Sequence, residues 1–178
     1  MSTVSGSINL SIIAREILSS GISKGVVNRS FESLLDLPSG SNDNQVNRCY
    51  AKRETGIAAS ITTSYDLIGS LLDEDGATIN FSEVVLIACR NLSSTLANDI
   101  RIGPHATVAG FGVLATSKGF WSAAADKSII GADGDSWVVM YSKAGVPAVA
   151  ATTDVLVVVT EAGTSLNTWD LLVLGRTN

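Results

Sequence analysis

Charged residues are scarce in this 178-residue chain, in which 12 Lys and Arg and 17 Asp and Glu amount to 16%. An ordinary soluble domain carries about 25%. Long apolar runs are also lacking, because no stretch approaches the ~18 apolar residues of a membrane helix. We therefore predict no membrane span. The low charge must have another explanation.

Cysteine and histidine are rare as well: the chain has only Cys49, Cys89 and His105. Two cysteines are too few for a disulfide scaffold, and each lies in strand-like sequence, where a thiol usually packs as a small core hydrophobe. A single bridge between the two is the alternative. One histidine and two distant cysteines do not supply a zinc ligand set. We predict neither a metal site nor a cofactor.

Positive charge is not clustered. The net charge is −5, and Lys52-Arg53 is the only adjacent pair of basic residues. A surface that binds phosphates needs grouped Lys and Arg, so we predict no nucleic-acid partner. The opening Met1–Gly6 has neither a basic region nor a following apolar region of the length found in secretory signals, so none is predicted.

The chain does have short, dense apolar runs of β type, such as Val84–Cys89 and Val155–Val159. Neighbouring side chains of a strand point to opposite faces, so such runs make both faces apolar. One face can line the chain's own core. The other face needs a second sheet, a covering loop or a neighbouring protein. We interpret the chain as a β protein that hides part of its surface in an assembly.

The first 44 residues differ from the rest. Apolar residues at a period of two predict a strand near the N-terminus, and the composition of Ala14–Leu18 favours a short turn of helix. Val27, Phe31 and Leu35 predict another strand, and the polar stretch Pro38–Asn44 is a strong break. We expect residues 1–44 to form an extended N-terminal arm or subdomain. Its candidate interface residues are Val4, Ile8, Leu10 and Ile12.

Residues 45–178 alternate between strand and turn signals without the amphipathic helices that a parallel sheet requires. This pattern predicts an all-β domain, an antiparallel β-sandwich or jelly-roll-like fold. The predicted strands are Arg48–Glu54, Ile61–Gly69, Ile79–Arg90 with a bend near Ser82, Asp99–Pro104, Phe120-Trp121, Ser128–Ile130, Ser136–Ser142, Asp154–Thr160 and Thr168–Leu174. The predicted turns are Leu71–Gly76, Asp133–Asp135, Ala144–Pro147 and Ala162–Ser165.

No residue pattern indicates catalysis. Gly21–Gly25 matches the nucleophile-elbow pattern, but it follows helix-like sequence, whereas an elbow Ser follows a strand. The acidic groups Asp73–Gly76 and Asp133–Asp135 lack the ligand spacing of a calcium loop and are typical of turns between strands. We expect a protein without enzymatic activity.

The three tryptophans are the most informative aromatic residues. Trp137 and Trp169 lie within apolar strand runs, so we predict that both are in the core. Trp121 follows Phe120 in weaker strand sequence, which makes Phe120 and Trp121 the better interface candidates. An exposed Trp121 beside paired carboxylates would instead suit a carbohydrate-binding β-sandwich.

The stretch from Thr63 to Ser93 resembles small virion proteins of tailed bacteriophages. It contains a Tyr-Asp-Leu-x-Gly strand at Tyr65–Gly69, an Asp-x-x-Gly turn at Asp73–Gly76, and a strand at Val84–Asn91 similar to the family's Val-x-x-Leu-x-Ile-x-Asn. Ala151–Thr160 and Thr168–Gly175 are similar to the family's closing hairpin, so the resemblance covers roughly residues 45–178. Where those proteins usually have a Pro-Gly-Gly turn, this chain has Gly131–Asp135.

The resemblance implies a capsid-associated β-sandwich. We therefore expect a cement or decoration protein, located in the virion, which binds the major capsid protein or another virion protein and stabilises the head shell. Repeated modest contacts raise the effective concentration of each further contact, so such a protein needs no chemistry. We expect a homo-oligomer, most simply a trimer, whose arm adds a strand to a neighbour's sheet. The alternatives are a tail adaptor, tube-associated or fibre component, and a carbohydrate-binding β-sandwich.

Overall fold

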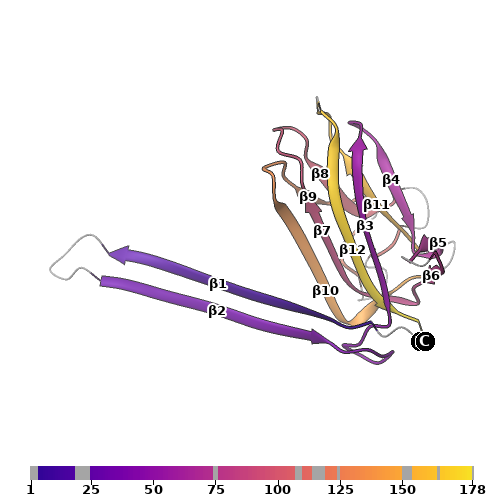
Figure 1. The fold of residues 1–178 in the computed structure, drawn as a ribbon, viewed down its shortest axis with the longest axis horizontal. Helices are drawn as coiled ribbons and strands as arrows, with labels where there is room; N and C mark the ends of the chain where they lie inside the picture. The colour runs from indigo at the N-terminus through magenta and orange to yellow at the C-terminus, as the bar shows by residue number, and fades with distance from the viewer. Residues whose placement is uncertain are drawn as a thin grey trace.

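Two antiparallel sheets pack face to face, and a long β-hairpin projects from one end of them (Figure 1). The computed structural model describes residues 4–18, 25–73, 76–106, 110–113, 119–123, 125–149, 154–163 and 165–177, and over 8–33 only the backbone is described. Within these residues the strands are β1 (Gly6–Leu18), β2 (Gly25–Leu37), β3 (Arg48–Ile57), β4 (Thr62–Asp66), β5 (Ile68–Leu72), β6 (Thr78–Asn80), β7 (Glu83–Asn91), β8 (Ile100–Pro104), β9 (Ser128–Ile130), β10 (Ser136–Pro147), β11 (Val155–Thr160) and β12 (Asn167–Arg176).

The two layers of the sandwich each contain four strands. Sheet I has the order β10-β7-β12-β3, and sheet II has the order β4-β11-β8-β9. All ladders between these strands are antiparallel. Strands β5 and β6 form a small separate hairpin. The predicted antiparallel β-sandwich is confirmed, and the described residues contain no helix.

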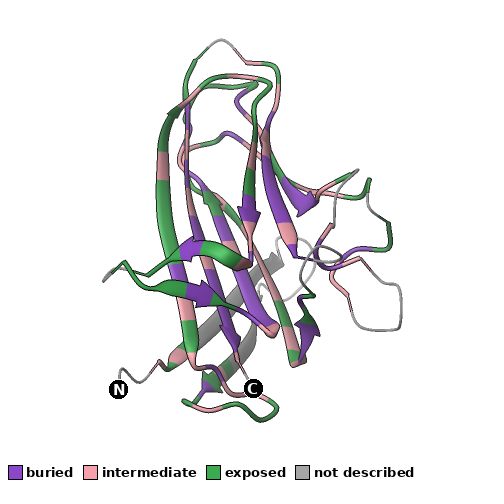
Figure 2. Cartoon of the chain, turned by 90° about the vertical axis from the view of Figure 1, so that its right-hand side faces the viewer, coloured by how far each residue is buried: buried purple, intermediate pink, exposed green. Residues whose placement is uncertain are grey.

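The main core lies between the sheets, and alternation along the strands produces it. In β12, Trp169, Leu171 and Val173 are buried in the core cluster, and Leu156 and Val158 from sheet II belong to the same cluster. Figure 2 shows buried stretches along the strands of both layers, with exposed segments in the connecting loops. Burial of alternate apolar side chains from both sheets is the main stabilising term of such a fold.

A hydrogen bond between two side chains crosses the core between the two sheets. The indole Nε1 of Trp169 donates to the hydroxyl oxygen of Tyr65 at 3.1 Å. Burial raises the pKa of Tyr65 above its ordinary value, so the hydroxyl stays protonated. A buried Trp N–H without a partner would be costly, so this pairing fixes how the two sheets face each other.

Strands β1 and β2 pair with each other along their whole length, from Gly6↔Leu37 to Leu18↔Gly25. Figure 1 shows this hairpin leaving the sandwich beside β10 and extending away from both sheets. The predicted strand and break near the N-terminus are therefore present. The predicted helical turn at Ala14–Leu18 is wrong, because this segment pairs with Gly25–Arg29 and the ladder overrides a weak helix preference.

Four further sequence predictions need correction. Phe120-Trp121 is not a strand, because Trp121 forms only an isolated bridge with Val113. The single strand expected over Ile79–Arg90 is two strands in different sheets, since β6 pairs with β5 whereas β7 joins sheet I. Likewise, Leu67 interrupts the strand expected over Ile61–Gly69 and separates β4 from β5. The turn expected at Ala144–Pro147 lies within β10, where the register with β7 shifts between Tyr141 and Val146. A bulge thus replaces the turn.

Candidate interaction surface

Sheet I has an outer face that points away from the core. Strand register sets three rows of side-chain positions across it. The first row is Trp137–Arg90–Asp170–Arg53, the second is Val139–Ala88–Leu172–Ala51, and the third is Tyr141–Leu86–Leu174–Cys49. The polarity therefore changes along the face, from charged and aromatic at one end to apolar at the other.

The base of the hairpin covers the apolar end of this outer face. Leu37 is buried and Leu35 is half-buried in a second hydrophobic cluster, together with Leu86 and Leu174 of sheet I. Gly6 approaches closely as well, because a Cβ on it would lie 3.1 Å from Cδ1 of Leu174. The outer face is therefore a second packing surface and not simply a solvated one.

Beyond the hairpin base the outer face is open. A shallow groove of about 660 Å³ runs over the first two rows, with mostly apolar walls. Ala51, Ala88 and Leu172 contribute to its floor, and Trp137 stands at its side on the edge strand β10. The Trp137 side chain is 60% exposed. An exposed tryptophan beside a partly covered apolar strip is a composition found at binding surfaces.

Two ion pairs border the groove. The Arg53 guanidinium donates to both carboxylate oxygens of Asp170, at 2.6 and 2.8 Å, in a bidentate arrangement. This hydrogen bonding holds the pKa of Asp170 below its ordinary value. Arg90 pairs with Asp135 in the turn before β10. Exposed pairs of this kind contribute little to stability, but they fix the position of charges beside the groove.

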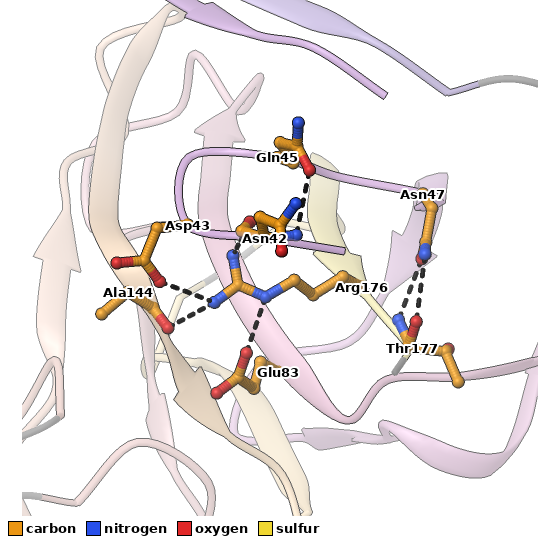
Figure 3. A network of polar contacts seen from close by, with 8 residues as sticks. All are labelled: Asn42, Asp43, Gln45, Asn47, Glu83, Ala144, Arg176 and Thr177. Carbon is orange, nitrogen blue, oxygen red and sulfur yellow. Dashed lines mark hydrogen bonds and ion pairs between the residues drawn. The ribbon is translucent and has the colours of Figure 1, made fainter. Parts of the chain in front are cut away.

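A buried arginine anchors the base of the hairpin to the sandwich (Figure 3). Arg176 in β12 is almost fully buried, and its Nε lies 2.6 Å from Oε2 of Glu83. Its Nη1 donates to the Asn42 carbonyl at 2.6 Å, and its Nη2 donates to the Ala144 carbonyl and lies 3.6 Å from Oδ1 of Asp43. One side chain therefore ties β7, the β10 bulge and the loop after the hairpin together.

The bulge in β10 is shaped for this arginine. Gly145 has φ +74°, and a Cβ there would lie 2.9 Å from Cβ of Glu83. A larger residue at this position would be strained and would push against the ion pair. The loop is held from the other side by Asn44, whose backbone N–H donates to the Lys143 carbonyl and whose amide donates to the Asp36 carbonyl. The loop at the base of the hairpin is thus tied to the sandwich from both sides.

The residues predicted as interface candidates fall in two places. Val4 is half-buried and packs with the second hydrophobic cluster. Ile8, Leu10 and Ile12 lie in β1, and their side chains are outside what the structure describes. Their backbone partners in β2 are Leu35, Ser33 and Phe31. Strand β1 therefore already has one pairing partner within its own chain.

Phe120 and Trp121 belong to the main core cluster. Trp121 is only 6% exposed, and its ring centroid lies 5.8 Å from that of Phe120, which in turn packs against Phe111. Gly112 allows this close packing, since a Cβ there would lie 2.8 Å from the Trp121 ring. The exposed Trp121 that a carbohydrate site would need is not present. As interface residues, Phe120 and Trp121 stay predictions.

Trp137 is the surface residue that the sequence did not identify. The prediction that Trp137 lies in the core is wrong, whereas Trp169 is fully buried as predicted. Trp137 pairs with Arg90, and both positions belong to the outer face of sheet I. The run Trp137–Met140 is apolar at every position, so no alternation marks which face is inner. The signal that could have placed Trp137 on the outer face is its pairing partner in β7, the charged Arg90.

Neither cysteine forms a disulfide; Cys89 is buried in the core and Cys49 is half-buried. Burial raises the pKa of the Cys89 thiol to about 12.

The acidic groups lie in turns, as predicted: Asp73 accepts a hydrogen bond from the Ala77 N–H, and the Ser136 hydroxyl donates to Asp133. The described residues contain no group of His, Cys, Asp and Glu that is arranged to hold a metal ion. Ser23 of the Gly21–Gly25 pattern lies outside the described residues.

No helix in the described part of the chain has the length and apolar character needed to cross a membrane. Comparisons with protein-family models, curated proteins and solved structures gave no match for this chain.

Proposed function

We propose that this chain is a non-enzymatic structural protein of a tailed-bacteriophage virion, which binds the assembled head shell and stabilises it. The observation that carries the proposal is the combination of an anchored, projecting hairpin with an uncovered apolar groove on the same sheet. Both features add contact surface without forming an enclosed site. The resemblance of residues 45–178 to virion proteins supports the same proposal.

The mechanism is multivalent contact. Each copy contacts the major capsid protein, or another virion protein, and also contacts further copies of itself. A closed cluster, most simply a trimer at a local threefold axis, would bind several shell subunits together. Each contact is modest, but release then requires that several break at the same time, because the remaining contacts keep the effective concentration high.

The test is a count of copies in particles of the phage that encodes the chain, by mass spectrometry with isotope-labelled reference peptides. A head-shell protein is expected at on the order of hundreds of copies per particle, following the symmetry of the shell. A count of about six or twelve would overturn the shell location in favour of a tail adaptor or tube-associated ring, which follows the symmetry of the tail axis. Absence from purified particles would overturn the whole proposal.

Binding to the shell is checked separately. Empty heads that lack the protein are mixed with the purified chain and sedimented, and the bound fraction is measured at increasing protein concentration. Saturable binding that raises the temperature of head disruption is expected. Binding that does not change head stability would contradict the cement mechanism.

A further inference from the structure

The hairpin has two chemically different faces. Register places Ile8, Leu10, Ile12, Phe31, Leu35 and Leu37 at positions on one face over the half nearest the sandwich. On the opposite face, Ser7, Asn9, Ser11, Ser30, Glu32 and Asp36 occupy most positions. We call the first set the apolar hairpin face. A two-stranded hairpin with such a face is at best marginally stable by itself in water.

The apolar hairpin face already packs on sheet I within one chain. Leu37 and Leu35, which belong to this face, lie in the hydrophobic cluster on the outer face of sheet I, against Leu86 and Leu174. Farther from the base, the strands leave the sandwich (Figure 1). The chain thus packs the first part of the face on its own outer sheet and carries the rest away from it.

The open groove is continuous with this packing. Leu86 and Leu174 in the covered row are followed, two residues along each strand, by Ala88 and Leu172 in the groove floor. The floor is therefore more of the same apolar surface that the hairpin base covers. Small side chains at Ala51 and Ala88 allow a close approach, and Trp137 and Arg53 stand on opposite sides as residue types enriched in binding hot spots.

We propose that the apolar hairpin face of one copy packs into the outer groove of sheet I of a second copy. Each chain gives one hairpin and receives one, and we take this head-to-tail contact to close into a ring, as in the trimer proposed above. This inference specifies the self-association on which the proposed function rests. It commits to a second copy as the occupant because the groove continues the surface on which the same hairpin face already packs.

The dimensions indicate a small contact. The apolar half of the hairpin extends for roughly 20 Å and is about 10 Å wide, so it presents at most roughly 200 Å². Giving one hairpin and receiving another brings this to about 400 Å² for each copy, below the ~800 Å² per partner of a standard interface. Each contact is therefore weak by itself, and a closed ring holds because its contacts act together.

The first experiment measures the mass of the purified full chain by sedimentation equilibrium over a range of concentrations. The wild type is expected to be a closed oligomer. Trp137→Ser and Ala51→Glu change exposed groove residues, and Ile12→Asp and Phe31→Asp change the apolar hairpin face. Each is expected to raise the dissociation constant by about tenfold or more, the change that corresponds to loss of one hot spot.

The matched control is Ile129→Ser in β9 of sheet II. Ile129 is 63% exposed, close to the exposure of Trp137, and lies in the other sheet. This variant is expected to keep the wild-type mass. A monomeric wild type, or equal weakening by Ile129→Ser and Trp137→Ser, would overturn the inference. A monomer that binds oligosaccharides through Trp137 would overturn it in favour of a glycan site.

A second experiment does not depend on how well the variants fold. Benzoylphenylalanine replaces Phe31, the chain is mixed with isotope-labelled copies, and the mixture is irradiated and digested. Cross-links between labelled and unlabelled copies are expected on peptides that contain Ala88, Trp137 or Leu172. Cross-links within one copy only, or to sheet II of the neighbour, would overturn the inference. Neither experiment uses phage heads, so failure of shell binding is a distinguishable result.

Discussion

The inner and outer faces of sheet I are built from the same strands and yet differ in burial and in composition. The inner face carries Trp169, fully buried and hydrogen-bonded across the core to Tyr65. The outer face carries Trp137, largely exposed beside an apolar groove. A sandwich needs only one apolar face per sheet to fold. The second apolar face of sheet I is therefore available for contacts outside the sandwich.

The hairpin and the sandwich show the same contrast at a larger scale. The sandwich encloses its own core, whereas the described side chains of the hairpin pack on it at the hairpin base, near the contacts of Arg176 and Asn44. The proposed self-association would use the hairpin and the outer groove, whereas the stability of the fold comes from the sandwich core. Substitutions that affect one part while sparing the other test this division.

The largest effect is expected from Trp169→Ala. Removal of a fully buried indole leaves a cavity and deprives the Tyr65 hydroxyl of its donor, so the free energy of unfolding should fall by about 4 kcal/mol. Trp137→Ala on the outer face should change it by less than about 0.5 kcal/mol. Urea unfolding followed by circular dichroism measures both. Similar losses for the two variants would contradict the assignment of faces.

The next largest effect is expected from Arg176→Met. The substitution leaves Glu83 unpaired at a mostly buried site and removes two bonds to backbone carbonyls, so stability should fall by about 3 kcal/mol. Arg48→Met, which changes an exposed arginine at the start of β3, is the matched control and should have little effect. Limited proteolysis should also cut the loop at residues 38–47 faster in Arg176→Met. Unchanged cleavage would show that Arg176 does not anchor the hairpin.

The reactivities of the two cysteines provide a chemical comparison of the core with the outer face of sheet I. Because burial raises the pKa of Cys89 to about 12, Cys89 should stay unmodified when the folded chain is treated with iodoacetamide at pH 8, whereas Cys49 reacts. Intact mass should show one adduct in the folded protein and two in denaturant.

The same burial makes stability depend on pH, because the folded state keeps the Cys89 thiol protonated to a higher pH than the unfolded state does. Its contribution to stability is therefore complete below pH 9 and is lost as pH rises toward 12.

The smallest effect is expected at the groove border. Arg53 lowers the pKa of Asp170, so the pair favours the folded state above the unfolded pKa of Asp170, and this contribution is lost as pH falls through the folded value. Both side chains are partly exposed, so Asp170→Asn should shift the urea midpoint far less than Arg176→Met. A shift as large as that of Arg176→Met would mean that the pair is structural.

The sequence was sufficient to predict the sandwich and most strand positions, because β-branched runs and Gly or Asp turns are local signals. It was not sufficient where pairing with a distant segment of the chain decides the secondary structure. Ala14–Leu18 forms a strand because Gly25–Arg29 pairs with it. Phe81 and Ser82 separate β6 from β7, although a strand follows directly on each side of them. Pairing across the chain, rather than local composition, sets these features.

The candidate surface was predictable only in part. The uncovered apolar area follows from strands that are apolar on both faces, and this expectation came from Val84–Cys89. The face that Trp137 occupies could not be predicted, because its neighbours Ser136–Met140 show no alternation. The anchor at Arg176 depends on the β10 bulge and the loop at Asn42, which lie far from it in the sequence.

The most direct test of the central claim is hydrogen–deuterium exchange of the full chain at several protein concentrations. If copies cover one another through the hairpin and the groove, amides of β1 and β2 should exchange slowly in concentrated samples and become faster on dilution. Amides of the core strand β11 should stay protected throughout, because their protection needs no second copy. Hairpin exchange that is equally fast at every concentration would contradict the account.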